Sequence, residues 1–562
     1  MHLRNELLAF SETFEGELHT DSLHREIYAT DASVYRKLPL AVAYPFTSVG
    51  VNQLVQFANN HKTSLVPRAA GTSLAGQCVG EGIIVDISRH MNRILHFDAA
   101  NKTVIVQPGV IRDELNAYLK SSGLFFGPNT STSNRCTIGG MVGNNSSGTT
   151  SIQYGVTRDK VLRLKTILSN GEEIVFGPIS KQIFKEKSTL PTMEGTIYRS
   201  LFEWLSPQDI QREIGKEFPK PEIHRRNTGY AVDLLLENEV FDAASKIPFN
   251  LCHLLCGSEG TLAFTTEITL QLDELPPVFS AMVVPQYKTL ESCLNDVVVA
   301  MQHDLHTCEM MDDVILECTK KNRMYEAYRF FVEGNPKALL MLEIRSNNEA
   351  QLKSETDKLL ATLQKSGLSY ATPVLLDPAI DMALELRKAG LGLLGNMVGD
   401  TKAVACIEDT AVALVDLPAY ISEFSELMDG YGQRAVYYAH AGAGELHLRP
   451  ILNLKEPEGV DYFRKITTDV AKLVKRYRGS FSGEHGDGIV RAEFLEMMIG
   501  TANFNLLRKI KHCFDPNNIF NPGKITDAWP MDKSLRYEVD RAEPSVNSFM
   551  DFSDSEGLLR LA

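Results

Sequence analysis

Two histidines and a glutamate form the clearest chemical pattern in this chain. His440 and His447 lie seven positions apart across two glycines, and Glu484 lies in a second glycine-flanked segment, directly before His485. Glycines at such positions let the backbone turn sharply, so both imidazoles can reach one point. Two histidines and a carboxylate with open positions are a common ligand set for a catalytic divalent metal ion. The combined pattern predicts a metal site, although each histidine alone is more often a structural residue.

Three segments rich in glycine and small residues lie in the N-terminal half, at residues 67–73, 127–148 and 256–262. Turns of this kind present consecutive backbone N–H groups to an anion. The first segment matches neither G-x-G-x-x-G nor G-x-x-x-x-G-K-[ST], so neither a nicotinamide site nor a Walker-type nucleotide site is indicated. Together the three loops predict a site for an extended, phosphate-bearing cofactor.

The elements that must carry these loops alternate between short strands and helices, which indicates an α+β fold. The N-terminal residues 1–30 have the composition of a charged, helical arm. The following half has predicted strands at residues 41–45, 64–67, 82–87, 102–106 and 263–272, and a helix over 49–61. In the second half, predicted strands at 281–285, 338–344 and 403–407 alternate with helices.

The composition excludes several classes of protein. The 562 residues carry a net charge of −14, so a protein that follows nucleic-acid phosphates with a basic face is excluded. No apolar run is long enough to span a membrane, and no secretory signal is visible at the start. The nine scattered cysteines are typical of reduced thiols. We therefore expect a cytoplasmic protein, with peripheral binding at the inner membrane face left open.

The order of the glycine motifs resembles a known flavoprotein family. P-R-x-x-G-T-S is followed by G-P, S-N-R-x-T-I-G-G and N-N-S-S-G, and then by G-S-E-G-T-L. This order is similar to the flavin domain of the vanillyl-alcohol-oxidase superfamily, and more narrowly to its D-lactate and D-2-hydroxyglutarate dehydrogenase and glycolate oxidase branch. The resemblance extends over residues 40–525.

The resemblance implies a two-subdomain FAD-binding domain of the PCMH type and an α+β substrate-capping domain with an antiparallel sheet. The expected boundaries are an N-terminal helical arm at 1–38, the FAD-binding domain at 39–273 with an insertion at about 179–250, the substrate and metal domain at 274–525, and a polar tail at 526–562.

The resemblance also implies which residues contact FAD. We expect non-covalent FAD, because the first loop lacks the histidine that links flavin in some superfamily members. The same loop departs from the family in having Ala69 and Ala70 where relatives often have glycines. Cys136 is expected to pack in the second loop rather than to react. The expected FAD contacts are Arg68, Ala69, Ala70, Gly71, Thr72, Ser73, Pro128, Thr137, Gly139, Gly140, Asn144, Asn145, Gly148, Glu259, Gly260 and Asn521.

By the same resemblance, His440, His447 and Glu484 would bind a divalent metal ion, with zinc the first expectation, and His485 would be the base. The chain departs from the family's commoner H-x-G-D-G-N-x-H at two positions, where Ala443 and Glu445 replace Asp and Asn. These replacements leave the histidine spacing intact but change the groups around the ion, which bear on the metal's identity.

Three cations are expected to hold the substrate. Arg387, in a predicted helix, and Lys402, before a predicted strand, match substrate-carboxylate positions in the family. Arg449 follows His447 by two residues, and two interpretations are open for it. It either forms an ion pair with Glu445 or another carboxylate, or it binds a second substrate carboxylate, which D-2-hydroxyglutarate has and D-lactate lacks.

The expected function is FAD- and metal-dependent oxidation of a D-2-hydroxy acid, either D-2-hydroxyglutarate or D-lactate, with electrons passing to a quinone or another carrier. Alternatives are the FAD subunit of a glycolate oxidase, a non-redox transferase like the flavin-dependent alkyl-ether-lipid synthases, and an electron-transfer module with a degenerate metal site. The form H-A-x-x-G-E-L-H-L-R-P also occurs in a branch that often continues into an iron–sulfur module. The scattered cysteines of these 562 residues form no ligand set for such a cluster, so a 4Fe–4S cluster is expected only if the native chain extends beyond residue 562. A homodimer is left open.

Overall fold

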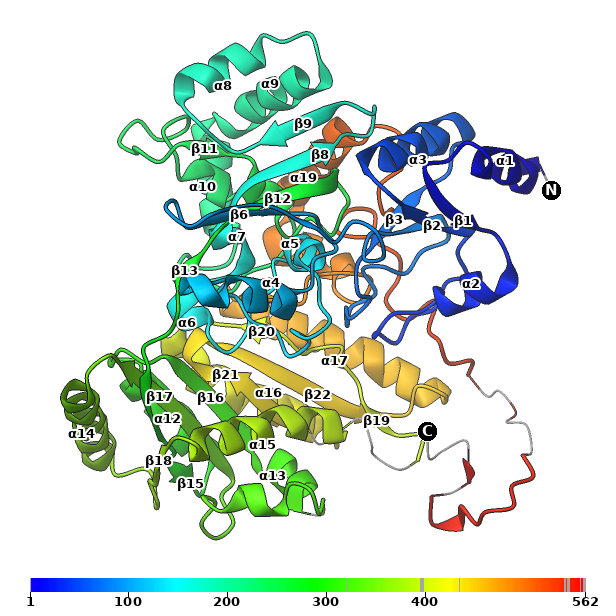
Figure 1. The fold of residues 1–562 in the computed structure, drawn as a ribbon. Coiled ribbons are helices and arrows are strands. Elements are labelled where there is room, and N and C mark those ends of the chain that lie inside the picture. The colour runs from blue at the N-terminus through cyan, green and yellow to red at the C-terminus, as the bar shows by residue number, and fades with distance from the viewer. Residues whose placement is uncertain are drawn as a thin grey trace.

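The two halves of the chain lie in different parts of the computed structural model, except that α19 (Thr501–Phe514) returns to pack beside elements of the N-terminal half (Figure 1). The structure describes residues 2–320, 322–394, 399–433, 435–539, 542, 546–555 and 557–558. Among the described residues, the N-terminal half contains a four-stranded sheet, a five-stranded sheet and two two-stranded sheets, and the C-terminal half contains one large sheet. The predicted tail at 526–562 lies partly outside the described residues, since 559–562 are not among them.

A four-stranded sheet begins the fold, in the order β1-β2-β4-β3. Its members are β1 (Gly16–His19), β2 (Ala41–Pro45), β4 (Ile83–Asp86) and β3 (Leu65–Arg68). The last three are parallel, and α3 (Ser48–His61), capped by the Thr47 side chain, makes the crossover. β1 pairs with β2 at the sheet edge, which corrects the prediction of a wholly helical arm. Only α1 (His2–Ser11) and α2 (Ser22–Ile27) are helical there.

A five-stranded antiparallel sheet follows, in the order β5-β6-β12-β8-β9. Its members are β5 (Ile94–Asp98), β6 (Thr103–Val106), β12 (Phe264–Gln271), β8 (Val161–Ile167) and β9 (Glu173–Phe176). β12 lies between β6 and β8 in the sheet, although it comes after β9 in the chain. The sheet is therefore complete only when the chain returns to it after the segment between β9 and β12. That segment contains α8 (Lys181–Ser188), α9 (Met193–Leu205) and α10 (Gln208–Glu217).

The large sheet of the C-terminal half has nine strands. Its main path is β18 (Val374–Leu376), β14 (Phe279–Val283), β17 (Ala338–Ser346), β16 (Thr307–Asp312), β21 (Ala435–His440), β22 (Glu445–Leu452) and β19 (Lys402–Ala403), with β15 (Gln286–Tyr287) and β20 (Thr410–Ala411) paired beside it. The strand predicted at 403–407 is wrong beyond Ala403, because the chain turns there before β20.

Helices cover both faces of this sheet (Figure 1). Apolar side chains of α13 (Asp313–Lys320) and α15 (Ala379–Leu394) pack with one set of strand residues, including Met311 and Met341. On the opposite face lie α12 (Leu290–Ala300), α14 (Glu349–Ser366) and α16 (Leu417–Gly430). Because successive strand residues point to opposite faces, each strand contributes to both cores.

On the adjacent strands β21 and β22, polar side chains interrupt the apolar sheet face that α15 covers. In the β21–β22 pair, His440 lies opposite Glu445, Tyr438 opposite His447 and Val436 opposite Arg449. Opposite residues of antiparallel strands have Cβ atoms about 4.5–5.5 Å apart on one face. The alternation of β22 therefore puts Glu445, His447 and Arg449 on the same face as His440.

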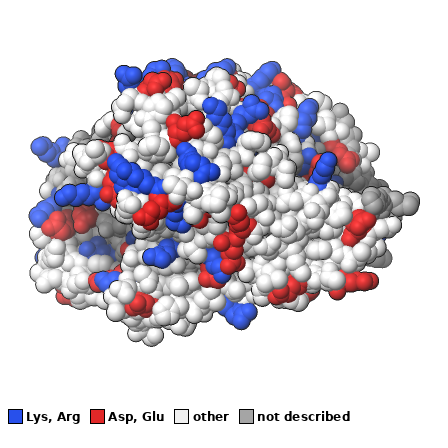
Figure 2. Space-filling view, turned by 90° about the horizontal axis from the view of Figure 1, so that it is seen from above, with Lys and Arg blue, Asp and Glu red and all other residues white. Residues whose placement is uncertain are grey.

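The surface carries charges of both signs. On the face shown in Figure 2, Lys and Arg side chains are scattered among Asp and Glu. No helix among the described residues combines the length and apolar character needed to cross a membrane. The α+β class and the antiparallel sheet expected in the second half are confirmed.

Candidate metal and flavin site

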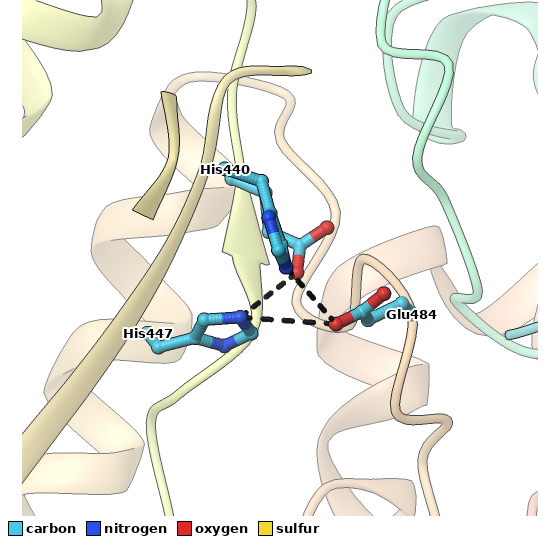
Figure 3. Close-up of side chains that lie close together, drawn as sticks. His440, His447 and Glu484 are labelled. Atoms are coloured by element: carbon cyan, nitrogen blue, oxygen red, sulfur yellow. Dashed lines mark ion pairs between the residues drawn. The ribbon is translucent and has the colours of Figure 1, made fainter. Parts of the chain in front are cut away.

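His440, His447 and Glu484 point toward one another in the fold (Figure 3). Glu484 Oε1 lies 3.6 Å from His440 Nε2 and 3.7 Å from His447 Nε2. All three side chains are buried. Together with Glu445, they offer four ligand atoms that all lie within 4.8 Å of one another. Two imidazoles and carboxylate oxygens at this spacing fit a divalent cation.

A hairpin and a loop position these side chains. β21 ends at His440, and β22 begins at Glu445 after a short turn that needs positive φ at Gly444. A Cβ at Gly444 would approach the Val412 carbonyl oxygen to 2.2 Å, so glycine is required there. The loop bearing Glu484 is fixed by Asp409, whose carboxylate accepts hydrogen bonds from the Glu484 N–H at 2.6 Å and the His485 N–H at 2.8 Å.

Glu309 of β16 links a metal-ligand candidate to a substrate-binding candidate. Its carboxylate lies 2.9 and 3.0 Å from His440 Nδ1, leaving Nε2 of that ring to face Glu484. The same carboxylate forms an ion pair with Arg387, whose guanidinium lies 4.2 Å over the Tyr438 ring. Glu309 is absent from the predicted set, and its strand, Thr307–Asp312, is not among the predicted strands either, so no sequence pattern singles it out.

We expect Glu309→Gln to weaken divalent-ion binding about 10- to 100-fold, because the residue behind a metal-binding histidine fixes its tautomer and its basicity. Isothermal titration of the FAD-loaded protein with Zn²⁺ measures this change. Glu343→Gln, at another buried glutamate of the same sheet that pairs with Arg345, is the matched control. Equal affinity of Glu309→Gln and wild type would show that Glu309 does not support the ligand.

Arg225 is a second residue that the sequence patterns did not reveal. It is 1% exposed, and one of its nitrogens, NH1, lies 2.6 Å from Glu445 Oε2 and 3.4 Å from Glu484 Oε2. It also donates to the Ser151 hydroxyl and to the Gly148 carbonyl of the second glycine loop. Arg225 lies in the stretch interpreted as an insertion, where no spacing relative to a motif distinguishes it.

The charges around the ligands set their protonation. Burial disfavours the charged form of His447, and His440 and His485 add to this effect, so the pKa of His447 lies well below its usual range. Burial opposes ionisation of Glu484, but Arg225 and His440 hold its pKa well below the usual range. His447 therefore offers a lone pair and Glu484 an anion, as metal binding requires.

His485 lies beside the ligands, with its Nδ1 3.1 Å from Glu408 Oε1 and its Nε2 3.4 Å from Glu484 Oε1. Burial disfavours its charged form, but Asp409 and Glu408 outweigh this effect and raise the pKa of His485 well above its usual range. Glu408 also holds Arg449, at 2.5 Å from NH2. Arg449 therefore forms the ion pair that one interpretation expected, with Glu408 rather than Glu445, and like Arg387 it lines the histidine cavity.

Lys402 is not brought to this cluster. It begins β19 at the edge of the large sheet and lines a separate cavity with Asp400, Leu452 and Tyr537. Arg387, in contrast, lines the cavity of the histidines. Of the three predicted substrate cations, the structure places two beside the histidines, each paired with a buried glutamate.

A continuous hollow connects the glycine loops to the histidines. Its inner part encloses about 1040 Å³, and a wider part of about 1710 Å³ shares Arg68, Gly71 and Ser73 with it. The wider part in turn shares His485 and Glu484 with the histidine cavity of about 950 Å³. The predicted flavin residues that line the inner part are Arg68, Ala69, Ala70, Gly71, Thr72, Ser73, Thr137, Gly139, Gly140, Asn144, Glu259 and Gly260.

The walls of the inner hollow fit a cofactor that approaches the backbone closely. Gly71 and Gly260 have positive φ, and a Cβ at Gly139 would meet the Pro108 side chain at 2.5 Å. Backbone surfaces stripped of side chains in this way are typical of phosphate and ring contacts. Gly148 instead lines the histidine cavity.

The other predicted flavin residues hold the loops in place. Asn145 bonds to Asn227 and to the Arg158 N–H, and Pro128 accepts a hydrogen bond from Arg112. Asn521 donates to the carbonyls of Gln77 and Glu259. The Glu259 carboxylate, although it borders the hollow, accepts from the N–H groups of Asp487 and Gly488. These contacts fasten the flavin loops to the segment that follows His485.

We expect the flavin to be released by acid precipitation, because no candidate attachment group in the hollow is activated. Cys136 lines the hollow, but burial raises the pKa of its thiol, so it remains protonated and a poor nucleophile. Absorption spectra of the supernatant and the pellet measure the release. Flavin that stays with the precipitated protein, and moves with it on a denaturing gel, would contradict this prediction.

The sequence comparisons assign both halves of the chain. Residues 39–177 match the FAD binding domain family, and residues 276–525 match the family of FAD linked oxidases, C-terminal domain. The chain belongs to the FAD-linked oxidase family of flavoproteins, and FAD is its cofactor. The resemblance drawn from the glycine motifs is confirmed.

Individual proteins with known names are also similar in sequence to this chain. The chain is 35% identical to a D-2-hydroxyglutarate dehydrogenase of Pantoea ananatis, over 92% of this chain and 51% of the relative. It is 26% identical to the glycolate oxidase subunit GlcD of Bacillus subtilis, over 89% of this chain and 92% of that one. The chain spans about half the length of the D-2-hydroxyglutarate dehydrogenases that it matches at 34–35% identity.

A solved structure supports the fold. p-Cresol methylhydroxylase with substrate bound matches with a TM-score of 0.65 and 14% identity, over 93% of this chain and 96% of that one. A likeness at this identity concerns the fold alone, and it confirms the expected PCMH-type architecture.

Proposed function

We propose that this protein oxidises a D-2-hydroxy acid to the 2-oxo acid, with D-2-hydroxyglutarate as the first candidate substrate and D-lactate the second. The observation that carries the proposal is the continuous hollow, in which the flavin loops and the His440, His447, Glu484 and His485 cluster share walls. The relative of Pantoea ananatis that matches at 35% identity is a D-2-hydroxyglutarate dehydrogenase, which supports this order of substrates.

The residues of the cluster have separate roles in the proposed reaction. FAD would accept the substrate's hydride. A divalent cation held by His440, His447 and Glu484 would polarise the substrate hydroxyl and, through like-charge repulsion, favour the neutral form of His485. Arg387, positioned by Glu309, would bind the substrate carboxylate through its two-pronged guanidinium. His485, oriented by Glu408, would accept the hydroxyl proton.

The electron acceptor is proposed to be a quinone or another non-nicotinamide carrier. The glycine loops at residues 67–73, 127–148 and 256–262 contain no G-x-G-x-x-G, and the G-x-G-x-x-G at residues 390–395 begins inside helix α15 instead of directly after a strand, as a nicotinamide site requires. An oxidation of glycolate, as the name of the Bacillus subtilis relative indicates for that protein, is the second candidate function. The same hollow and the same carboxylate-binding arginine would serve it.

Anaerobic mixing tests the proposal. The FAD-loaded, Zn²⁺-supplemented protein is mixed with D-2-hydroxyglutarate, D-lactate, L-lactate or glycolate, with and without a chelator. We expect D-2-hydroxyglutarate to bleach the flavin absorbance fastest, D-lactate more slowly and L-lactate not at all. Chelation should suppress bleaching without releasing flavin. A flavin that no hydroxy acid bleaches would reject the oxidase function and favour the non-redox transferase or electron-transfer alternatives.

A further inference from the structure

Glu445 occupies a position that a simple charge partner of Arg225 does not explain. Its side chain is fully buried, and it lies opposite His440 in the β21–β22 pair. Arg225 NH1 bonds to Oε2 of Glu445, so Oε1 points elsewhere. Oε1 accepts no hydrogen bond from any residue that the structure describes. A buried carboxylate oxygen without a donor is costly unless a cation occupies the space that it faces.

The space that Oε1 faces is the metal site. Glu445 Oε1 lies 3.7 Å from His447 Nε2, the same distance as Glu484 Oε1. Ligands at 2.0–2.2 Å from a tetrahedral ion are separated by about 3.3–3.6 Å. Three of the carboxylate–imidazole pairs are separated by 3.6–3.7 Å, close to that spacing, and all four ligand atoms lie within 4.8 Å of one another.

Arg225 arranges both glutamates for this purpose. The NH1 nitrogen of Arg225 forms ion pairs with Oε2 of Glu445 and Oε2 of Glu484. The Oε1 atoms of both carboxylates are therefore left to face the imidazoles. Arg225 also opposes the effect of burial and of Glu484, which together raise the pKa of Glu445 to about 8, and so it reduces the cost of ionising a second carboxylate at one site. The contacts of Arg225 with Gly148 and Ser151 fix this arrangement to the second glycine loop.

We infer that Glu445 is a fourth protein ligand, so that this chain binds its divalent ion through two histidines and two glutamates. The inference rests on the metal site of the proposed function and goes beyond it. A second carboxylate makes the donor set harder and more anionic, and such oxygen ligands suit Mn²⁺ better than a site with one carboxylate does. A four-coordinate ion would then have no position left for substrate oxygen, so the proposed polarisation of the hydroxyl requires an ion of higher coordination number, which Mn²⁺ readily adopts.

Three variants of the FAD-loaded protein separate a ligand from a counter-ion. Glu445→Gln removes the charge, and the amide can still accept from Arg225. Glu445→Asp keeps the charge but withdraws the carboxylate by one methylene. Glu408→Gln is the matched control, because it removes a buried glutamate charge from the same cluster without removing an atom that faces both metal-binding imidazoles. Circular dichroism and the bound-flavin spectrum check that each variant is folded.

The metal alone is the probe. Titration with Mn²⁺ and Zn²⁺ gives affinities, and the visible spectrum of the Co²⁺-loaded protein reports the ligand set. We expect Glu445→Gln and Glu445→Asp each to raise the Kd for Mn²⁺ about 100-fold or more, beyond the 10- to 100-fold range of outer groups. Both variants should change the Co²⁺ spectrum, whereas Glu408→Gln should leave it unchanged.

Other outcomes overturn the inference or the proposal beneath it. If Glu445→Asp binds like wild type and Glu445→Gln keeps the wild-type Co²⁺ spectrum, Glu445 is a counter-ion only, and the proposed function stands. If wild-type protein binds no equivalent of Mn²⁺, Zn²⁺ or Co²⁺ while hydroxy acids still bleach its flavin, the metal site itself is rejected.

Discussion

Replacing His447 by Ala is expected to lower kcat/KM for D-2-hydroxyglutarate by about 10³-fold or more. The imidazole faces Glu484 and Glu445 at 3.7 Å, so its removal deletes one ligand of the proposed ion. Lewis-acid activation of a substrate oxygen contributes several kcal/mol, and about 4 kcal/mol corresponds to 10³-fold in rate. Steady-state kinetics, with elemental analysis for bound metal, measures both effects.

Flavin should remain bound in this variant, because the flavin loops and the hairpin bearing His447 are different segments. His306→Ala is the control. His306 is also buried, but it contacts Tyr154 rather than the cluster. If His447→Ala keeps both its metal and its rate, the ligand assignment is wrong.

Replacing His485 by Gln should lower kcat about 10²- to 10⁴-fold, the usual contribution of a general base. In contrast to His447→Ala, this variant should retain both the metal ion and FAD, because His485 groups with Glu408 and His447 and is not one of the four ligand candidates around His440. Single-turnover flavin reduction isolates the chemical step from product release. Near-normal reduction by D-2-hydroxyglutarate would assign the proton to another group.

The tightest contacts of the candidate site join residues that no motif connects. Glu309 contacts His440, 131 positions later, and also Arg387. Arg225, which lies between α10 and β12 in the chain, contacts Glu445 and Glu484. These partners are single charged residues in ordinary surroundings. Their roles follow from sheet order and burial, which depend on long-range pairing.

The sequence by itself determined the features that depend on local geometry. Glycine-flanked motifs indicate backbone turns and cofactor loops, because only glycine adopts positive φ freely, as at Gly71, Gly260 and Gly444. The spacing of His440 and His447 sufficed to indicate a hairpin that brings their rings together. Strand and helix periodicity gave the α+β class, and it failed mainly in short segments, such as β1 and residues 403–407, where few positions define a period.

Only the tertiary structure decided which cations line the histidine cavity and with which carboxylate each of them pairs. Arg449 is matched by Glu408, and Arg387 by Glu309, whereas Lys402 lies at a different cavity. In a one-dimensional sequence each of these cations is equally available to a substrate. Within a buried cluster a charge must be paired, because desolvation costs several kcal/mol, and the partner is chosen by which strands lie side by side. One oxygen of Glu445, in contrast, has no donor among the described residues and lies 3.7 Å from His447 Nε2.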